Sequence, residues 1–223
     1  MSQYLQDKVT IVTGAGSGFG RIISQKCAAG GARMVGVDID EDGLKETVAS
    51  IETAGGTAVG QKADVSSSDD MEAAAKLAID NYGTIDVIVN NAGIMPLAFF
   101  SDHAAALKKW HLAIDVNIKG VVNGIAAVYD TMMSQGRGQV VNIASIYGNA
   151  GTQGSGVYSA TKAAVEILSN LAADGGKRGD QGHYDQAHRC VRNESARKCH
   201  QSGRTHRDSG PALGTVRRAV GRV

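Results

Sequence analysis

Tyr158 and Lys162 are four residues apart in the segment YSATK, a spacing that brings two side chains onto one face of a helix. A tyrosine by itself has a pKa of about 10 and is a poor base at neutral pH. A neighbouring ammonium group favours the phenolate and lowers that pKa, so that the tyrosine can take or give a proton. This spacing is also common by chance. Tyr158 and Lys162 could therefore be an ordinary pair on a helix surface.

Ser145 favours the catalytic interpretation. It follows the apolar run Gln139–Ala144, which is typical of a strand, and it precedes Tyr158 by thirteen residues. From the end of that strand its hydroxyl could hydrogen-bond the same substrate oxygen as the tyrosine. Together with Lys162, these residues predict proton transfer coupled to the movement of a hydride.

A second chemistry-bearing segment is the loop TGAGSGFG near the N-terminus. It lies between a predicted strand, Lys8–Thr13, and a predicted helix, Gly18–Ala29. Such a loop brings backbone N–H groups and a helix N-terminus up to a phosphate. The pattern is T-G-x-x-x-G-x-G, with Gly14, Gly18 and Gly20 in the glycine positions. By itself, the loop could also be an ordinary tight connection between a strand and a helix.

Asp38 ends the next predicted strand, Arg33–Asp38, eighteen residues after Gly20. A carboxylate at this position can accept hydrogen bonds from both ribose hydroxyls of an adenosine, and it would repel the 2′-phosphate of NADP. No arginine follows Asp38 immediately, and Arg33 lies at the other end of the strand. The sequence therefore favours NAD over NADP. Alternatively, Asp38 could be a solvated turn residue with no role in binding.

Two further predicted strands end in residues suited to a ligand site. Asp64-Val65 ends one strand, and the segment NNAG, Asn90–Gly93, ends the next. Open parallel sheets bind ligands at the carboxyl ends of their strands. The small residues Ala92 and Gly93 would let a cofactor lie close, whereas the Asn90 amide could also connect neighbouring strands.

Alternating apolar runs and helical periods predict the elements that position these motifs. We expect five strands, at Lys8–Thr13, Arg33–Asp38, Thr57–Asp64, Ile85–Val89 and Gln139–Ala144. The predicted helices are Gly18–Ala29, Glu41–Ala54, Asp69–Tyr82, Ala104–Ser134 and Val157–Ala173. Continuously apolar strands indicate a parallel sheet covered on both faces. The expected fold is α/β, a doubly wound parallel sheet (Rossmann) truncated after the fifth strand and its following helix.

Composition narrows the classes of function. The 223 residues suffice for one large domain, and the net charge of +1 gives no general attraction to nucleic acid. Three cysteines, Cys27, Cys190 and Cys199, are too few and too irregularly spaced for a disulfide framework. The N-terminus is polar, and no uncharged apolar run is long enough to span a bilayer. We expect a cytoplasmic protein with no specific nucleic-acid or membrane partner.

Over residues 5–173 the chain resembles the short-chain dehydrogenase/reductase family. The resemblance rests on five motifs in order: TGAGSGFG, Asp64-Val65, NNAG, the Ser145 segment NIASIYG, and YSATK. The family's fourth catalytic residue is an asparagine in the long middle helix, and Asn117 in DVNIKG matches it. The resemblance also implies a homodimer or homotetramer, with the tetramer in doubt here.

The resemblance implies a catalytic tetrad. Tyr158 would be the general acid/base, and Lys162 would lower its pKa and hold the nicotinamide ribose. Ser145 would orient the substrate carbonyl, and Asn117 would hold a water in a proton relay to Lys162. The reaction would be reversible hydride transfer between NAD(H) and a secondary alcohol or ketone. The residues expected to bind the cofactor are Gly14, Ser17, Gly18, Phe19, Gly20, Asp38, Asp64, Val65, Asn91, Ala92, Gly93, Tyr158 and Lys162.

The character of the sequence changes after Asp174. Residues 175–223 hold 11 of the 23 basic residues and four of the six histidines, with almost no apolar periodicity. Shifting the reading frame by one base over Asp180–Cys190 permits a β-branched strand followed by Pro-x-Gly-Val, similar to the family's next segment. We therefore divide the chain into a catalytic domain, residues 1–174, and an out-of-frame basic tail. The alternative for the tail is genuine divergence.

Such a tail has functional consequences. The family's later strands and its substrate-covering segment would be lost, so the enzyme would be impaired. The alternative function is a non-catalytic NAD-binding protein or pseudoenzyme. A Rossmann domain fused to a basic nucleic-acid-binding tail is a further alternative. The scattered histidines and cysteines of the tail have no metal-ligand spacing, so no metal site is predicted.

Overall fold

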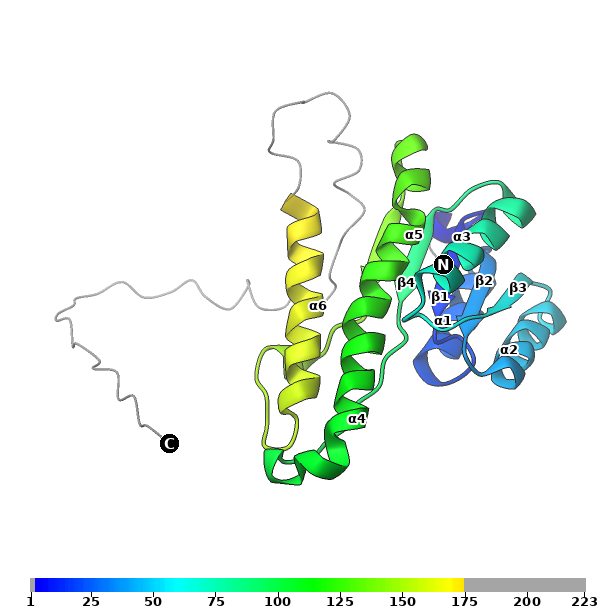
Figure 1. The fold of residues 1–223 in the computed structure, drawn as a ribbon. Coiled ribbons are helices and arrows are strands. Elements are labelled where there is room, and N and C mark those ends of the chain that lie inside the picture. Colours follow the sequence, from blue (N-terminus) through cyan, green and yellow to red (C-terminus); the bar gives the residue numbers. More distant parts are fainter. Residues whose placement is uncertain (1–2, 175–223) are drawn as a thin grey trace, which may run out of the picture. The chain divides into compact units, whose positions relative to one another are not determined.

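Five parallel strands form the centre of the fold in the computed structural model, which describes residues 3–174 (Figure 1). They are β1 (Val9–Thr13), β2 (Arg33–Asp38), β3 (Thr57–Lys62), β4 (Val87–Asn90) and β5 (Gln139–Asn142). Their order across the sheet is β3-β2-β1-β4-β5, and every neighbouring pair is parallel. This arrangement confirms the predicted doubly wound sheet.

The strand order reverses between β1 and β4. From β1 the chain steps outward through β2 to β3, then crosses back over β1 to reach β4 and β5. The register places Val12 beside Val89 and Asn90 beside Asn142. The loops that follow β1 and β4 therefore leave the same edge of the sheet in opposite directions, which is where open α/β sheets bind ligands.

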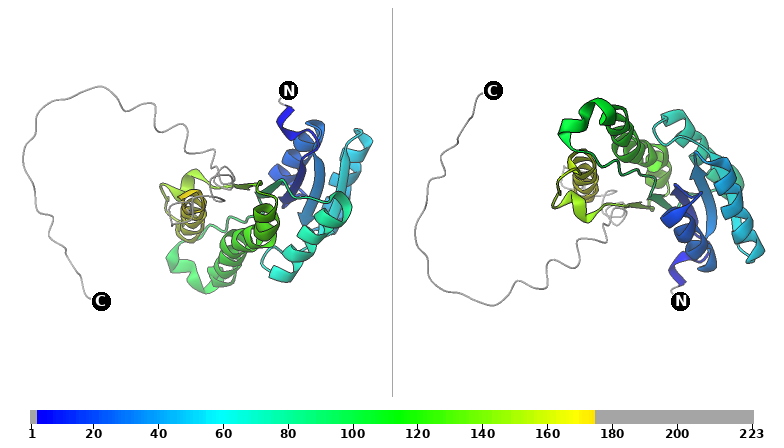
Figure 2. Two further views of the ribbon diagram at one scale, coloured as in Figure 1. Left: turned by 90° about the horizontal axis from the view of Figure 1, so that it is seen from above. Right: turned by 90° about the horizontal axis from the view of Figure 1, so that it is seen from below.

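Helices cover both faces of the sheet (Figures 1 and 2). They are α1 (Gly18–Ala29), α2 (Glu41–Thr53), α3 (Ser68–Tyr82), α4 (His103–Ile114), α5 (Gly120–Ser134) and α6 (Gly156–Asp174). One core cluster packs α1 and α2 against the sheet, and a second packs α3 and α5 against it. The last helix, α6, lies beside α4 (Figure 1). The alternation of inward and outward residues along each strand produces these two separate cores.

The long middle helix contains an interruption that the apolar period does not reveal. One π-helical turn, Asp115–Lys119, joins α4 to α5 and places Asn117 in a fully buried position. Residues 100–134 are long and apolar enough to cross a membrane by length and composition alone. Core helices of soluble proteins meet the same criterion, and here Val128 and Met132 pack into the core beneath the sheet. One such helix is weak evidence for a membrane span, and 33% of its apolar window is buried inside the structure.

Several element boundaries differ from the predicted ones for local reasons. The Ile85 N–H donates to the Gln135 side chain at 3.1 Å, outside the strand ladder, and β4 begins only at Val87. The strand β3 ends at Lys62. Among residues 3–174, β5 pairs with β4 alone. The predicted out-of-frame tail, residues 175–223 with Cys190 and Cys199, lies outside the described residues.

Candidate active site

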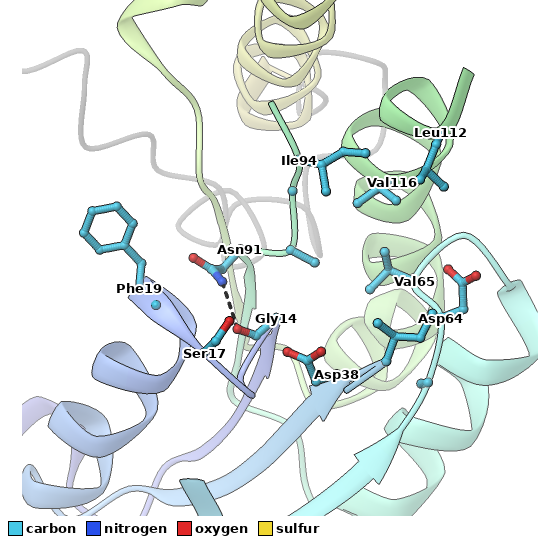
Figure 3. Close-up of a pocket in the computed structure, with 15 residues that line it drawn as sticks. Gly14, Ser17, Phe19, Asp38, Asp64, Val65, Asn91, Ile94, Leu112 and Val116 are labelled. Atoms are coloured by element: carbon cyan, nitrogen blue, oxygen red, sulfur yellow. Dashed lines mark hydrogen bonds between the residues drawn. The ribbon is translucent and has the colours of Figure 1, made fainter. Parts of the chain in front are cut away.

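A cavity of about 460 Å³ opens at the carboxyl ends of β1, β2 and β4 (Figure 3). Ten of the residues expected to bind a cofactor line it: Gly14, Ser17, Gly18, Phe19, Asp38, Asp64, Val65, Asn91, Ala92 and Gly93. The fold therefore brings together four segments that are far apart in the sequence. These are the glycine loop, the ends of β2 and β3, and the segment NNAG.

The glycine loop lies close to its neighbours at two positions. Gly14 has a φ of 68°, and a Cβ there would lie 2.9 Å from the Asn91 side-chain nitrogen. A Cβ at Gly20 would overlap the Gly14 carbonyl oxygen. Gly20 does not line the cavity; instead it lets α1 pack directly beneath the loop. A side chain at Gly14 would push the loop away from Asn91 and Ala92, and one at Gly20 would force the loop and α1 apart.

The N-terminus of α1 is electrostatically different from those of α2 and α3. Ser17 is its N-cap residue, but the serine side chain makes no capping bond and the first turn holds no acidic residue. In contrast, α2 and α3 each carry two acidic residues in the first turn and a side-chain cap. The positive end of the α1 dipole and its N–H groups are therefore not neutralised by the chain, as an anion such as a phosphate requires.

Hydrogen bonds connect the glycine loop to the segment after β4. The Asn91 side chain donates from Nδ2 to the Thr13 carbonyl at 2.9 Å and to the Gly14 carbonyl at 3.4 Å, the second of which is drawn in Figure 3. The Thr13 hydroxyl oxygen accepts from the backbone N–H groups of Asn91 and Ala92, each at 3.0 Å. These contacts set the position of one wall of the cavity relative to the other.

Asp38 points its carboxylate toward the glycine loop (Figure 3). Its Oδ2 accepts from the Gly16 N–H at 2.7 Å, and its Oδ1 accepts from the Asp40 N–H at 2.9 Å. Each carboxylate oxygen can accept more than one hydrogen bond. Both oxygens therefore retain capacity to accept from a ligand's hydroxyl groups.

Lys162 approaches the same region from α6. Its side chain is buried, and Nζ donates to the Ile143 carbonyl at 2.7 Å. Burial lowers the pKa of this amine. A Cβ at Gly93 would lie 3.5 Å from Lys162 Nζ and 3.2 Å from Asn117 Oδ1. Gly93 thus lies close to both Lys162 and Asn117, two of the residues proposed from the sequence as catalytic.

Asn117 connects the β4 loop to α6. Its Oδ1 accepts from the Ile94 N–H, and its Nδ2 donates to the Ile94 carbonyl, both at 2.9 Å. The second Nδ2 hydrogen goes to the Thr161 hydroxyl at 3.0 Å. That hydroxyl in turn donates to the Tyr158 carbonyl at 2.7 Å. The helical turn that carries Tyr158 is therefore linked to the π-helical turn.

Ser145 caps the short 3-10 turn Ile146–Gly148, with its Oγ accepting from the Tyr147 N–H at 3.3 Å. The Tyr147 ring meets Tyr158 edge to face, with 5.9 Å between ring centroids. A Cβ at Gly148 would lie 3.0 Å from the Lys162 backbone, so this turn packs tightly on α6. The turn that follows β5 thereby comes to the same end of α6 as Tyr158.

The sequence reasoning missed five residues that line the cavity: Ile39, Ala63, Ile94, Leu112 and Val116. Leu112 and Val116 lie one helical turn apart, just before Asn117, and Ile94 follows NNAG directly. Their positions beside predicted site residues are the signal that could have identified them.

Tyr158 and Lys162 do not line this cavity. In residues 3–174, no group of three His, Cys, Asp or Glu side chains could hold a metal ion.

A family model for short chain dehydrogenases matches residues 8–179. The chain belongs to the short-chain dehydrogenase family. An uncharacterised oxidoreductase of Listeria monocytogenes is 38% identical over 169 residues, which cover 75% of this chain and 66% of that protein. A 2,5-dichloro-2,5-cyclohexadiene-1,4-diol dehydrogenase of Sphingobium indicum is 34% identical over 173 residues, 78% of this chain and 68% of that one. The chain thus spans about two thirds of the length of these relatives.

Two solved structures of short-chain dehydrogenases have the same fold. One is a short-chain dehydrogenase/reductase from Burkholderia phymatum in complex with NAD, with a TM-score of 0.75 and 33% identity. It is matched over 81% of this chain and 64% of its own. The other is levodione reductase, with a TM-score of 0.72 and 34% identity over 78% of this chain and 67% of its own. The family resemblance predicted from the motifs is confirmed.

Proposed function

We propose that this chain is an NAD-dependent oxidoreductase of the short-chain dehydrogenase type, acting on a secondary alcohol or ketone. One observation carries the proposal: the cavity at the strand-order reversal has the glycine loop, Asp38 and Asn91–Gly93 in its wall. The buried Lys162 amine lies close to Gly93 from outside this cavity. The NAD complex of the Burkholderia phymatum relative supports the choice of cofactor. The dehydrogenase and reductase names of two relatives support the type of reaction.

The residues present fit NAD. The N–H groups at the start of α1, together with the loop at Gly14, would hold the diphosphate. The Asp38 carboxylate would accept from the ribose hydroxyls of the adenosine and repel a 2′-phosphate. Asn91–Gly93 would lie along the nicotinamide half. When bound, NAD supplies the acceptor or donor of the hydride.

The proposed tetrad moves a proton at the substrate oxygen. Tyr158 gives or takes that proton, and Ser145 orients the oxygen by a hydrogen bond. Lys162, anchored on the Ile143 carbonyl, lies one helical turn after Tyr158 and would also hold the nicotinamide ribose. Both Nδ2 hydrogens of Asn117 are already used, so its oxygen would hold the relay water.

Titration calorimetry with NAD and turnover assays with a panel of secondary alcohols test the proposal. The parent chain is expected to bind NAD. Tyr158→Phe is expected to retain the NAD dissociation constant and lose turnover, by at least about a hundredfold. The matched control is Tyr82→Phe, at a tyrosine at the end of α3 whose hydroxyl makes no hydrogen bond within the described residues, and it should alter neither quantity. A parent chain that binds no NAD contradicts the proposed function.

A non-catalytic NAD-binding protein is the second candidate. About a third of the Listeria relative's length has no counterpart in the matched region, so catalysis by this chain is tested separately from NAD binding. NAD binding by the parent chain without turnover of any tested alcohol or ketone would support this candidate. Turnover that is lost in Tyr158→Phe would contradict it.

We also propose that the chain forms a homodimer in the cytoplasm. A stripe of exposed apolar residues follows the outer side of the α4–α5 helix: Leu107, Ile114, Val122 and Tyr129. Their spacing is two helical turns throughout, with one added residue across the π-helical turn. A second copy of the chain could cover this stripe. Val122→Lys should then shift the sedimentation of the chain to that of a monomer.

A further inference from the structure

Arg21, in the first turn of α1, ties the glycine loop to α2. Its Nε and Nη2 donate to the Gly16 carbonyl at 3.1 and 2.5 Å. The same Nη2 donates to the Gly43 carbonyl at 3.1 Å and pairs with Glu46 at 2.9 Å. A planar guanidinium, with several N–H donors in a fixed arrangement, suits contact with two carbonyls and a carboxylate. Arg21 does not line the cavity, so it acts on the loop from behind.

Both peptide groups that meet at Gly16 are held. Its carbonyl accepts from Arg21, and its N–H donates to Asp38 Oδ2 at 2.7 Å. A Cβ at Gly16 would lie 2.9 Å from the Asp38 carboxylate, so the two groups are already in contact. A rotation of this glycine would therefore move the hydrogen-bond donor that orients the Asp38 carboxylate.

The surroundings of Gly16 leave it few other positions. A Cβ at Gly43 would lie 2.7 Å from the Gly16 carbonyl oxygen, so the first turn of α2 rests directly on that oxygen. The neighbouring Ala15 carbonyl accepts from the buried Thr47 hydroxyl at 2.9 Å. Arg21 thus sits where the glycine loop, the start of α2 and the end of β2 meet.

We propose that Arg21 is a positioning residue for cofactor selectivity. It holds Gly16 by its carbonyl and thereby positions the Gly16 N–H that orients the Asp38 carboxylate, and so controls how strongly the site prefers a free ribose 2′-hydroxyl to a 2′-phosphate. The inference rests on the proposed function. A purely structural clamp would affect the binding of NAD and NADP alike, whereas the proposed role changes the ratio of their dissociation constants.

The experiment measures both dissociation constants by titration calorimetry on the full chain. Arg21→Met is expected to weaken NAD binding about tenfold and to weaken NADP binding much less, because a charge-assisted contact that orients only Asp38 is lost. Arg21→Lys should restore part of the preference for NAD, and it provides the test if Arg21→Met does not fold. Glu46→Gln removes only the exposed partner of Arg21 and should leave both constants within about twofold.

A second step asks whether Arg21 acts through Asp38. In the Asp38→Asn background, Arg21→Met should produce no further change in the NADP-to-NAD ratio, because the group that Arg21 orients has lost its charge. If the parent chain binds NAD and Arg21→Met leaves the ratio unchanged, this inference alone is overturned. The inference is also overturned if Arg21→Met changes the NADP-to-NAD ratio by the same factor in the Asp38→Asn background as in the parent chain. If the parent chain binds neither nucleotide, the proposed function fails and the inference fails with it.

Discussion

Asn117 and Ile94 exchange two hydrogen bonds, each 2.9 Å long, between a buried side chain and a single backbone unit. Ile94 lies next to Gly93 in the wall of the cavity, and Asn117 lies on the only π-helical turn of residues 3–174. The irregular turn therefore rotates an amide inward to where the loop after β4 needs both a donor and an acceptor. The position of the proposed catalytic asparagine has a structural cause independent of any bound cofactor.

Removal of this amide should destabilise the protein. In Asn117→Ala the N–H and carbonyl of Ile94 and the Thr161 hydroxyl all lose a partner in the interior. We expect the free energy of unfolding in urea to fall by about 2 kcal/mol, since each of the two Ile94 groups left without its partner costs about 1 kcal/mol or more, whereas the Thr161 hydroxyl still donates to the Tyr158 carbonyl. Asn123→Ala, which loses a single bond to the Val65 carbonyl, is the comparison and should cost less. Equal stability of Asn117→Ala and the parent would contradict the prediction.

Two glycine substitutions distinguish a steric effect of the new methyl group from the effect of an unfavourable backbone conformation. Gly20→Ala places a methyl group on the Gly14 carbonyl and should weaken NAD binding by about a hundredfold or prevent folding of α1 against the loop. Gly83→Ala is the control: its φ is 75°, with no atom within 4 Å of the new Cβ. It should cost about 1 kcal/mol of stability and leave NAD binding unchanged. Calorimetry and thermal melts measure both effects, and unaltered NAD binding by Gly20→Ala would refute the argument.

Asp86 should make the stability of the protein depend on pH. Burial acts to raise the pKa of its carboxyl, but the Val9 N–H, Arg137 and Lys8 together hold that pKa below its usual value. The unfolded chain therefore binds more protons than the folded one in this range, and stability falls as the pH drops below the ordinary carboxyl pKa of about 4. Asp86→Asn should lower stability by about 2 kcal/mol at pH 7 and flatten the loss between pH 5 and pH 3. Urea titrations across this range provide the measurement, and an unchanged slope would count against the prediction.

Lys162 should oppose stability while it serves the proposed reaction. Burial lowers the pKa of its amine, so in the pH range between the folded and unfolded values the unfolded chain binds the extra proton and stability rises with pH. Lys162→Met removes the buried charge and should raise the free energy of unfolding at pH 7 by about 1 kcal/mol, while turnover disappears. Lys76→Met, at an exposed lysine paired with Asp80, should leave stability nearly unchanged. A destabilised Lys162→Met variant would mean that the bond to the Ile143 carbonyl outweighs the burial of the charge.

The sequence by itself determined the fold class, the family and most of the cavity wall. The bounds of α1 and β2 were predicted to the residue, because apolar periodicity, strand-ending aspartate and loop glycines are local signals. The sequence predicted that the glycine loop, Asp38 and NNAG lie close together, because parallel strands end at one edge of the sheet.

The tertiary structure alone decided how those residues are held. Asn117 and Ile94 are 23 residues apart, and Gly16 and Asp38 are 22 apart, so their bonds depend on how neighbouring elements pack. Packing between elements also places Leu112 and Val116 in the cavity wall. It brings the Arg21 side chain within hydrogen-bond distance of the Gly16 and Gly43 carbonyls. Sequence periodicity specifies which side of an element faces the core, but a hydrogen bond between two elements requires their relative position to within a few tenths of an ångström. That precision comes only from the complete set of contacts in the folded chain.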